Sequence, residues 1–161
     1  MLIRPCRAED CAALAQLFFE TVHAVNCADY TPAQLDAWAP APPPLEGWTA
    51  RLMSTRTFVA EAEQGLLGFA NLEPGGYLDC LFVRRDCQRQ GVGAALCSAV
   101  EQAAGPVRMT AEVSLTARGF FEHRGWRVVR CQQVERRGQR LTNFVMERPT
   151  VPAGETGVIK Y

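Results

Sequence analysis

Two glycines one residue apart, Gly91 and Gly93, stand between an apolar run and a stretch with helical periodicity. The apolar run is typical of a strand, so the glycines would lie at the N-terminus of the helix that follows it. Backbone N–H groups at a helix N-terminus have no intrahelical acceptor, and the helix dipole favours negative charge there. Glycine also lets the backbone approach a bulky anion closely. The pattern therefore predicts a turn that binds a phosphate or pyrophosphate.

Two common nucleotide-binding motifs do not fit these residues. The dinucleotide-binding fingerprint needs a third glycine where Leu96 stands, and the nucleotide P-loop needs a Gly-Lys-Ser/Thr sequence that is absent from the chain. A dinucleotide-binding oxidoreductase is disfavoured further because the chain is rich in predicted hairpins, whereas that fold repeats strand–helix units.

The residues around the glycines resemble the GCN5-related N-acetyltransferases (GNAT). Gln88-x-x-Gly91-x-Gly93 is similar to that family's Gln/Arg-x-x-Gly-x-Gly/Ala signature. Leu81-x-Val83 looks like its Leu-x-Val strand, at the usual distance before the glycines. The resemblance therefore implies that the predicted anion-binding turn binds the phosphates of a cofactor.

The resemblance continues on both sides of the turn. Residues 117–126 are similar to the family's Ala-x-x-Phe-Tyr-x-x-x-Gly-Phe segment, and the match spans roughly residues 57–147, with a first strand expected at the N-terminus. Residues 19–26 and 144–146 further resemble the YafP-like bacterial branch. Because three motifs occur in the family's order, we expect an acetyltransferase.

The resemblance implies acetyl-CoA as the cosubstrate, with no metal. The pyrophosphate would lie on N–H groups of the glycine turn, and the pantetheine arm would pair through main-chain hydrogen bonds with the strand before it. The residues expected to bind acetyl-CoA are Leu81, Phe82, Val83, Gln88, Arg89, Gln90, Gly91, Val92, Gly93, Ala94, Ser114 and Phe121.

Direct attack of an amine on acetyl-CoA in a ternary complex needs a base for the amine proton and donors for the thioester oxygen. Asp79 is the first candidate base, and an unbroken strand would place it on one face with Tyr77, Leu81 and Val83. Glu112 on the next strand is the rival, since a single bulge would change the parity and exchange the roles. Tyr77 is the third catalytic candidate.

The leaving thiolate also prefers a proton from a general acid. The family's usual acid is the tyrosine of the Phe-Tyr motif, and Phe121 stands at that position here. The remaining candidate donors, besides water, are Tyr30, Tyr77, Cys80, Ser114 and His123. Ser114 has an equal interpretation as a helix N-cap. The missing tyrosine keeps a second function open, a non-catalytic acyl-CoA-binding or sensor domain.

The acceptor site is expected on the N-terminal helices. Their distinctive residues are His23, Asn26, Asp29, Tyr30, Trp38 and Trp48. Aromatic rings near an acid would suit a small cationic or aromatic amine, while a peptide N-terminus or a lysine is the other class of acceptor. The competing interpretation of Trp38 and His23 is structural.

Composition is consistent with one cytoplasmic domain. The chain has 161 residues, of which 48% are hydrophobic and 21% charged. Seventeen basic and seventeen acidic residues cancel, which disfavours nucleic acid and membrane surfaces as partners. No apolar run has the length of a membrane span, and the N-terminus lacks the apolar core of a signal peptide. The seven cysteines have no zinc spacing and are interpreted as reduced thiols.

Periodicity predicts an α+β domain over residues 1–150 and a tail over residues 151–161. Helices are expected over 8–26, in a short segment after Thr31, and over 45–54, 91–104 and 115–124. Strands are expected over 1–5, 57–63, 66–73, 77–83, 107–113, 126–135 and 140–147. The resemblance implies a twisted, mixed, mostly antiparallel sheet whose splayed strands form a V-shaped cofactor cleft. Whether the chain is a monomer or a homodimer stays open.

Overall fold

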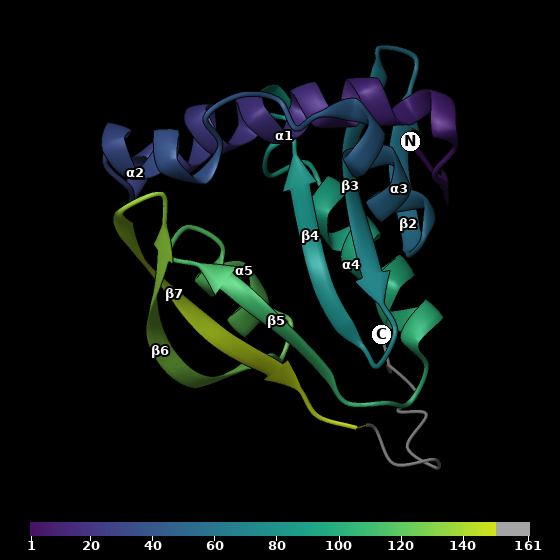
Figure 1. Ribbon diagram of the computed structural model, residues 1–161. Helices are drawn as coiled ribbons and strands as arrows, with labels where there is room; N and C mark the ends of the chain where they lie inside the picture. The colour runs from purple at the N-terminus through teal and green to yellow at the C-terminus, as the bar shows by residue number, and fades with distance from the viewer. Residues whose placement is uncertain (151–161) are drawn as a thin grey trace.

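The computed structural model describes residues 1–150, and the tail over residues 151–161 lies outside them. Within these residues one sheet of seven strands has the order β1-β2-β3-β4-β5-β7-β6, with helices on both faces (Figure 1). The strands are β1 (Leu2–Pro5), β2 (Arg56–Ala62), β3 (Gly65–Glu73), β4 (Tyr77–Val83), β5 (Met109–Ser114), β6 (Arg127–Arg136) and β7 (Gln139–Arg148). The predicted α+β class and the predicted hairpins are confirmed.

Five α-helices and three short 3-10 helices connect these strands in the described residues. The α-helices are α1 (Cys11–Val25), α2 (Pro32–Trp38), α3 (Leu45–Met53), α4 (Val92–Ala104) and α5 (Arg118–His123). The 3-10 helices are η1 (Ala8–Asp10), η2 (Asn26–Ala28) and η3 (Arg85–Cys87). The predicted helix over 8–26 is therefore interrupted at both ends. None of the helices described is long and apolar enough to cross a membrane.

The sheet opens between β4 and β5. These two strands are parallel and pair only at Tyr77 and Thr110, whereas every other neighbouring pair is antiparallel. From that pair the two strands diverge toward their C-terminal ends, and α1 and α2 lie across the open end (Figure 1). Beyond Tyr77, the edge of β4 that faces β5 has no strand partner among the described residues. The expected V shape of the sheet is confirmed.

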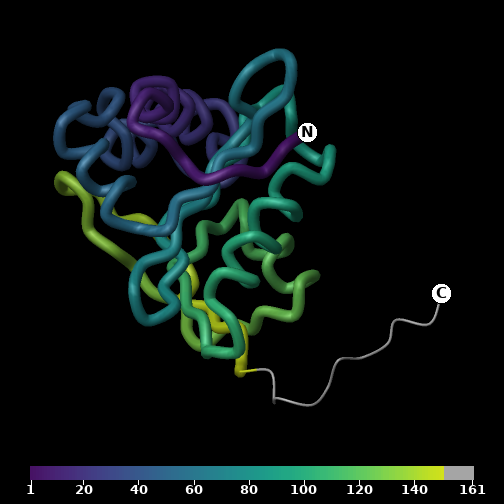
Figure 2. Tube along the Cα trace, turned by 90° about the vertical axis from the view of Figure 1, so that its right-hand side faces the viewer, coloured from purple at the N-terminus to yellow at the C-terminus, as the bar shows by residue number. Residues whose placement is uncertain are grey.

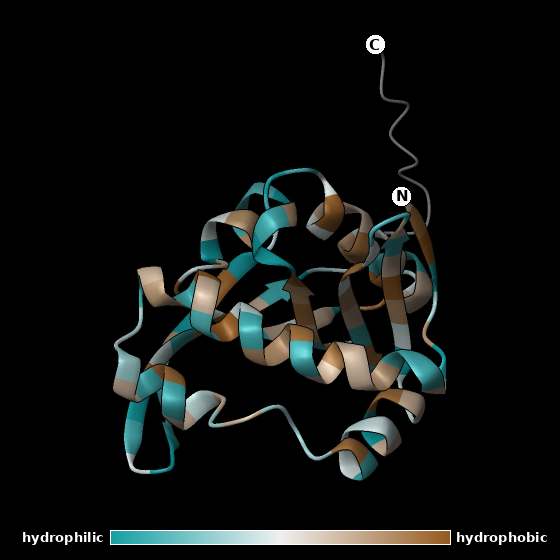
Figure 3. Cartoon of the chain, turned by 90° about the horizontal axis from the view of Figure 1, so that it is seen from above, coloured by the Kyte–Doolittle hydropathy of each residue, from teal (hydrophilic) through white to brown (hydrophobic). Residues whose placement is uncertain are grey.

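Apolar side chains hold the helices on the two faces. Leu96 and Val100 of α4 are fully buried in a core cluster with β5, β7 and α5, while Leu14 of α1 and Leu52 of α3 are buried on the other face. Figure 2 shows α1 nearly end-on, with α4 on the opposite side of the sheet. Hydrophobic residues gather on the strands and on the helix sides that face them (Figure 3). The sheet thus separates two packed layers of helices, and the V is the gap between β4 and β5 within it.

An ion-pair cluster at the N-terminus ties β1 to η1 and β2. Arg4 lies 2.8 Å from Asp10 and 2.7 Å from Glu61. The hydrogen bond from Arg4 lowers the pKa of Asp10 below its ordinary value of 3.8. A carboxylate with a lowered folded-state pKa stabilises the fold above its unfolded pKa, and this stabilisation is lost as the pH falls through the folded pKa.

We therefore expect the melting temperature to fall as the pH drops below about 4, partly through Asp10. Asp10→Asn should cost about 1.5–3 kcal/mol at pH 7, the usual contribution of hydrogen bonds to charged groups. Thermal unfolding followed by circular dichroism between pH 3 and pH 7 measures both effects. An Asp10→Asn protein with the same pH dependence as the wild type would show that this cluster does not govern acid stability.

Candidate active site

The glycine turn lies where β4 ends and α4 begins. Gly91 is the N-cap of α4, with a φ of 82°, a left-handed conformation that favours glycine. The first intrahelical bond runs from the Ala95 N–H to the Gly91 carbonyl, so the N–H groups of Val92, Gly93 and Ala94 have no acceptor within the helix. A Cβ atom built at Gly91 would meet nothing within 4 Å. The turn therefore has both the donors and the open space that an anion needs.

Polar side chains in the turn hold its shape. The Gln88 amide donates to the Val83 carbonyl at 2.6 Å, and the Thr21 hydroxyl donates to the same oxygen at 3.5 Å. The Gln90 amide donates to the Asp86 carbonyl at 2.9 Å. The side-chain amides of Gln88 and Gln90 are thus hydrogen-bonded to the protein's own backbone. An expected contact of either residue with a cofactor would go through the main chain.

A β-bulge interrupts β4 in the middle of the candidate site. Leu72 of β3 pairs with Leu78, but the next residue along, Asn71, pairs with Cys80. Asp79 is therefore an extra residue in β4, and the alternation of side chains shifts at this point.

The expectation that Tyr77, Asp79, Leu81 and Val83 share one face is wrong for this reason. Leu81 and Val83 pack into the core cluster on the α4 side of the sheet. Asp79 instead pairs with Arg51 of α3, on the opposite side. A bulge depends on the partner strand, so the alternation of β4 alone could not reveal it.

Asp79 is held in a network rather than left free. The Arg51 Nε lies 3.0 Å from its Oδ2, and the Arg51 Nη2 contacts the same oxygen. The Asn71 amide donates to that oxygen at 3.1 Å and also to the Thr55 hydroxyl at 3.4 Å. The Asp79 side chain is only 13% exposed. The carboxylate therefore has strong structural partners, which a free catalytic base would lack.

Tyr77 lies at the closed end of the V, where the charges of Glu112 and Asp79 both act on it. Burial, followed by the charges of Glu112 and Asp79, raises the pKa of Tyr77 to about 12. The Tyr77 hydroxyl thus stays protonated at neutral pH, and it has no hydrogen-bond partner in residues 1–150. Glu112 is exposed on β5 and has no ion pair within the same residues. The structure thus places Tyr77 near both candidate carboxylates.

Ser114 caps a turn at the end of β5. Its hydroxyl accepts from the Ala117 N–H at 3.1 Å and from the Asn26 amide at 3.5 Å. This turn delays α5, which begins at Arg118 rather than at residue 115 as predicted. Ser114 is therefore not the N-cap of α5, which is Ala117; its hydroxyl instead closes the turn before the helix.

Two other candidate proton donors, Tyr30 and Cys80, are hydrogen-bonded elsewhere or enclosed. The Tyr30 hydroxyl donates to the Thr142 carbonyl at 2.6 Å and accepts from the Leu115 N–H at 3.0 Å. Burial, followed by the charge of Asp79, raises the pKa of Cys80, so its thiol is a poor acid. Tyr77 is left as the tyrosine with a free hydroxyl near the carboxylates.

The two phenylalanines of α5 point to different places. Phe121 is 3% exposed, and its ring packs against Trp126 with centroids 5.0 Å apart. Phe120 lies beside the turn, since its ring is 3.6 Å from where a Cβ on Gly93 would stand. Phe121, expected to bind the cofactor, is thus covered by core residues. Phe120 is the α5 aromatic next to the turn, and no sequence signal separated the two.

The residues expected in the acceptor site divide between the core and the opening. Trp48 is 4% exposed and packs in the core against Phe69. The His23 Nε2–H donates to the Ala39 carbonyl at 2.8 Å, so this histidine fastens α1 to the end of α2. Tyr30 and Trp38 remain near the open end of the V, where their rings lie 5.6 Å apart.

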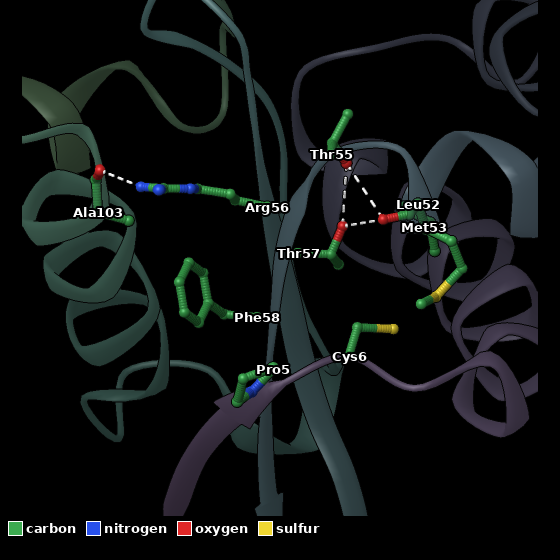
Figure 4. Close-up of a pocket in the computed structure, with 9 residues that line it drawn as sticks. All are labelled: Pro5, Cys6, Leu52, Met53, Thr55, Arg56, Thr57, Phe58 and Ala103. Carbon is green, nitrogen blue, oxygen red and sulfur yellow. Dashed lines mark hydrogen bonds between the residues drawn. The ribbon is translucent and has the colours of Figure 1, made fainter.

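Two hollows lie outside the V. One of about 250 Å³ sits at the sheet edge between α3 and α4, where Arg56 donates to the Ala103 carbonyl and the Thr57 hydroxyl donates to the Leu52 carbonyl (Figure 4). The other, about 1000 Å³, runs along α1 beside Arg84 and η3, just before the glycine turn. We place the candidate site at the V because the glycine turn and Tyr77 lie there.

Comparison with known proteins decides the family. The model of the acetyltransferase (GNAT) domain matches residues 26–148. The chain belongs to the GNAT family. YafP of Escherichia coli K12, named an uncharacterized N-acetyltransferase, is 32% identical over 145 residues, which are 89% of this chain and 93% of YafP. The resemblance to GNAT enzymes and to the YafP-like branch is confirmed, and the chain is an acyltransferase.

Solved structures are consistent with the assignment to the GNAT family. A GCN5-related N-acetyltransferase from Rhodopseudomonas palustris is 30% identical, with a TM-score of 0.87 over 93% of this chain and 95% of that one. The PaiA N-acetyltransferase from Thermoplasma acidophilum, solved with coenzyme A, has a TM-score of 0.70 at 17% identity over 92% of this chain and 98% of that one. At that identity the second likeness supports the GNAT fold alone.

Proposed function

We propose that this GNAT protein uses acetyl-CoA and passes the acetyl group directly to an amine bound beside it. One observation carries the proposal: the unpaired edge of β4 runs into the N-terminus of α4, where three N–H groups have no acceptor in the helix. A peptide-like arm can add to a strand edge, and a pyrophosphate suits a helix N-terminus. The two sites are continuous, as the pantetheine arm and pyrophosphate of acetyl-CoA are.

The hydrogen-bond pattern of β4 supports particular main-chain groups as those that would bind the arm. The Arg84 N–H donates to the Leu67 carbonyl of β3. Main-chain groups alternate in an antiparallel pair, so those of Phe82 also face β3, while those of Leu81 and Val83 face the V. Gln88 and Thr21 already donate to the Val83 carbonyl, which leaves the N–H groups of Leu81 and Val83 as donors. They would hold the arm, and the Leu81 N–H, the one nearer Tyr77, could stabilise the thioester oxygen.

We assign the base role to Glu112. It is exposed at the V and unpaired within residues 1–150, whereas Asp79 is bound by Arg51 and Asn71. Glu112 would take a proton from the amine, whose nitrogen then bonds to the acetyl carbon as the carbon–sulfur bond breaks. Asp79 would position Arg51 and the bulge instead.

Tyr77 would assist the leaving sulfur. Because burial raises the pKa of Tyr77 to about 12, its hydroxyl remains a hydrogen-bond donor throughout the neutral range. A hydroxyl of such weak acidity stabilises a developing thiolate by donating a hydrogen bond, and water can then supply the proton. This arrangement gives the site a donor in place of the tyrosine that Phe121 replaces.

The cofactor part of the proposal predicts selective stabilisation. Acetyl-CoA should raise the melting temperature, because a ligand that binds only the folded form stabilises it by about 2.7 kcal/mol at a hundred times its dissociation constant. NADH and ATP at the same concentration should have much smaller effects, since neither has a peptide-like arm for the edge of β4. Equal stabilisation by all three in differential scanning fluorimetry would mean that the turn is a general anion site.

A further inference from the structure

Aromatic rings bridge the open end of the V. Trp38, the last residue of α2, lies 6.4 Å from Phe82 of β4 and 5.6 Å from Tyr30, measured between ring centroids. Elsewhere α2 packs on β7 and β6, which belong to the other limb of the V. Trp38 therefore reaches across the opening. The rings of Trp38 and Phe82 cover it on the side of α1 and α2, and we call these two rings the roof.

These rings keep accessible surface. Trp38 and Phe82 are half-buried, whereas Trp48 and Trp126 are 4% and 3% exposed. Phe82 also meets Phe69 in a stacked contact at 5.8 Å, which fixes its orientation. A core tryptophan would be closed off as Trp48 is. Both rings pack against a core cluster, yet part of their surface stays accessible to a flat apolar ligand.

Negative charge lies below this roof. On β5, Met109, Ala111 and Val113 point into the core on the α4 side, so Glu112 and Ser114 point to the same side as the roof. Glu112 is one step nearer the closed end than Ser114, close to Tyr77. Arg51 pairs with Asp79, whereas Glu112 forms no ion pair within residues 1–150. The rings of Trp38 and Phe82 thus lie at the open end of the V, and the unpaired carboxylate of Glu112 lies nearer its closed end.

We infer that the acceptor is a primary amine on a short aromatic body, an arylalkylamine, with Trp38 as its specificity-determining residue. The inference rests on the proposed acetyltransferase function. The ring of the acceptor would pack on Trp38 and Phe82, and its ammonium group would face Glu112. A polyamine would leave the rings unused, and a peptide would bring polar main-chain groups against them.

The same arrangement fits the reaction. The ammonium form is drawn to Glu112, which takes one proton and leaves the neutral amine to attack. The nitrogen bonds to the acetyl carbon and the carbon–sulfur bond breaks. The second proton then leaves the nitrogen and passes through water to the thiolate, so coenzyme A leaves as the thiol. The product amide carries no charge. It therefore loses its attraction to Glu112, which favours release.

The test compares four acceptors by the rate of coenzyme A release: 2-phenylethylamine, 2-cyclohexylethylamine, putrescine and the dipeptide Ala-Phe. We expect the highest kcat/KM for 2-phenylethylamine, up to about tenfold above its saturated analogue, as the strength of an aromatic contact allows. Trp38→Leu should lower this kcat/KM about tenfold, mainly through KM, and abolish the preference for the aromatic ring. Trp38→Phe keeps an aromatic ring at this position and should retain most of the kcat/KM for 2-phenylethylamine.

A binding readout separates the inference from the reaction. Trp38 is the tryptophan with accessible surface, so 2-phenylethylamine should shield the protein's fluorescence from acrylamide, and Trp38→Phe should remove that effect. Faster release with putrescine or the dipeptide, or an unchanged Trp38→Leu variant, would overturn the arylalkylamine inference and leave the proposed function standing. Shielding without acetylation of any amine would support the ligand class and refute the proposed reaction.

Discussion

Replacing Gly91 with aspartate is expected to abolish acetyl-CoA binding while the protein still folds. The new side chain would enter open space, because nothing lies within 4 Å of a Cβ at this position. Its carboxylate would stand where the pyrophosphate is expected. At about 4 Å and an effective dielectric constant of about 20, two like charges repel by about 4 kcal/mol, equivalent to about a thousandfold in affinity. Isothermal titration with acetyl-CoA measures the loss.

Gly91→Asn is the matched control. Asparagine has nearly the same shape, and both residues tolerate the left-handed backbone that Gly91 adopts, with a φ of 82°. The two variants should therefore have similar melting temperatures, but only the aspartate should eliminate binding through charge. A folded Gly91→Asp protein that retains wild-type affinity for acetyl-CoA would exclude this turn as the pyrophosphate site.

The second large effect is expected at Glu112. Glu112→Gln keeps the shape of the side chain and removes its ability to accept a proton, so kcat should fall by about 10²–10⁴-fold, the usual contribution of a positioned base. The dissociation constant for acetyl-CoA should stay close to that of the wild type, because the arm is expected to bind main-chain groups of β4. The acidic limb of the rate-versus-pH curve should disappear with the carboxylate.

Asp79→Asn separates the two carboxylates. Asparagine can still accept a hydrogen bond from Arg51, but the ion pair is lost, so we expect reduced stability and a smaller loss of kcat than in Glu112→Gln. Its pH profile should keep the acidic limb. If Asp79→Asn loses that limb and Glu112→Gln keeps it, Asp79 is the base and Glu112 is a surface carboxylate.

Local signals in the chain were sufficient for much of the fold. Gly91 and Gly93 mark the start of α4, and Thr31 and Gln34 form the predicted capping box, with N–O distances of 3.2 and 2.9 Å. Hairpins followed from alternation and glycine turns, since both depend on residues close in sequence. The GNAT resemblance added the V-shaped sheet, which periodicity alone does not contain.

Contacts between distant segments explain what the sequence did not reveal. The bulge at Asp79 depends on the register of β3, and Arg51 is 28 positions away from Asp79. Neither leaves a signature in β4 itself. Phe120 and Phe121 are identical in type, so only the direction of α5 decides which one meets Gly93 and which one enters the core. Roles that depend on packing therefore required the structure.

The most direct test of the account is the stoichiometry of acetyl transfer. Purified protein would be incubated with acetyl-CoA and 2-phenylethylamine, putrescine or a dipeptide, with free thiol and acetylated amine measured together by colorimetry and mass spectrometry. The account predicts one acetylated amine for each coenzyme A released, with catalytic turnover that Glu112→Gln reduces. Tight acetyl-CoA binding with no amine acetylated and no thiol released would contradict it, and would identify a sensor of acyl-CoA on a GNAT fold.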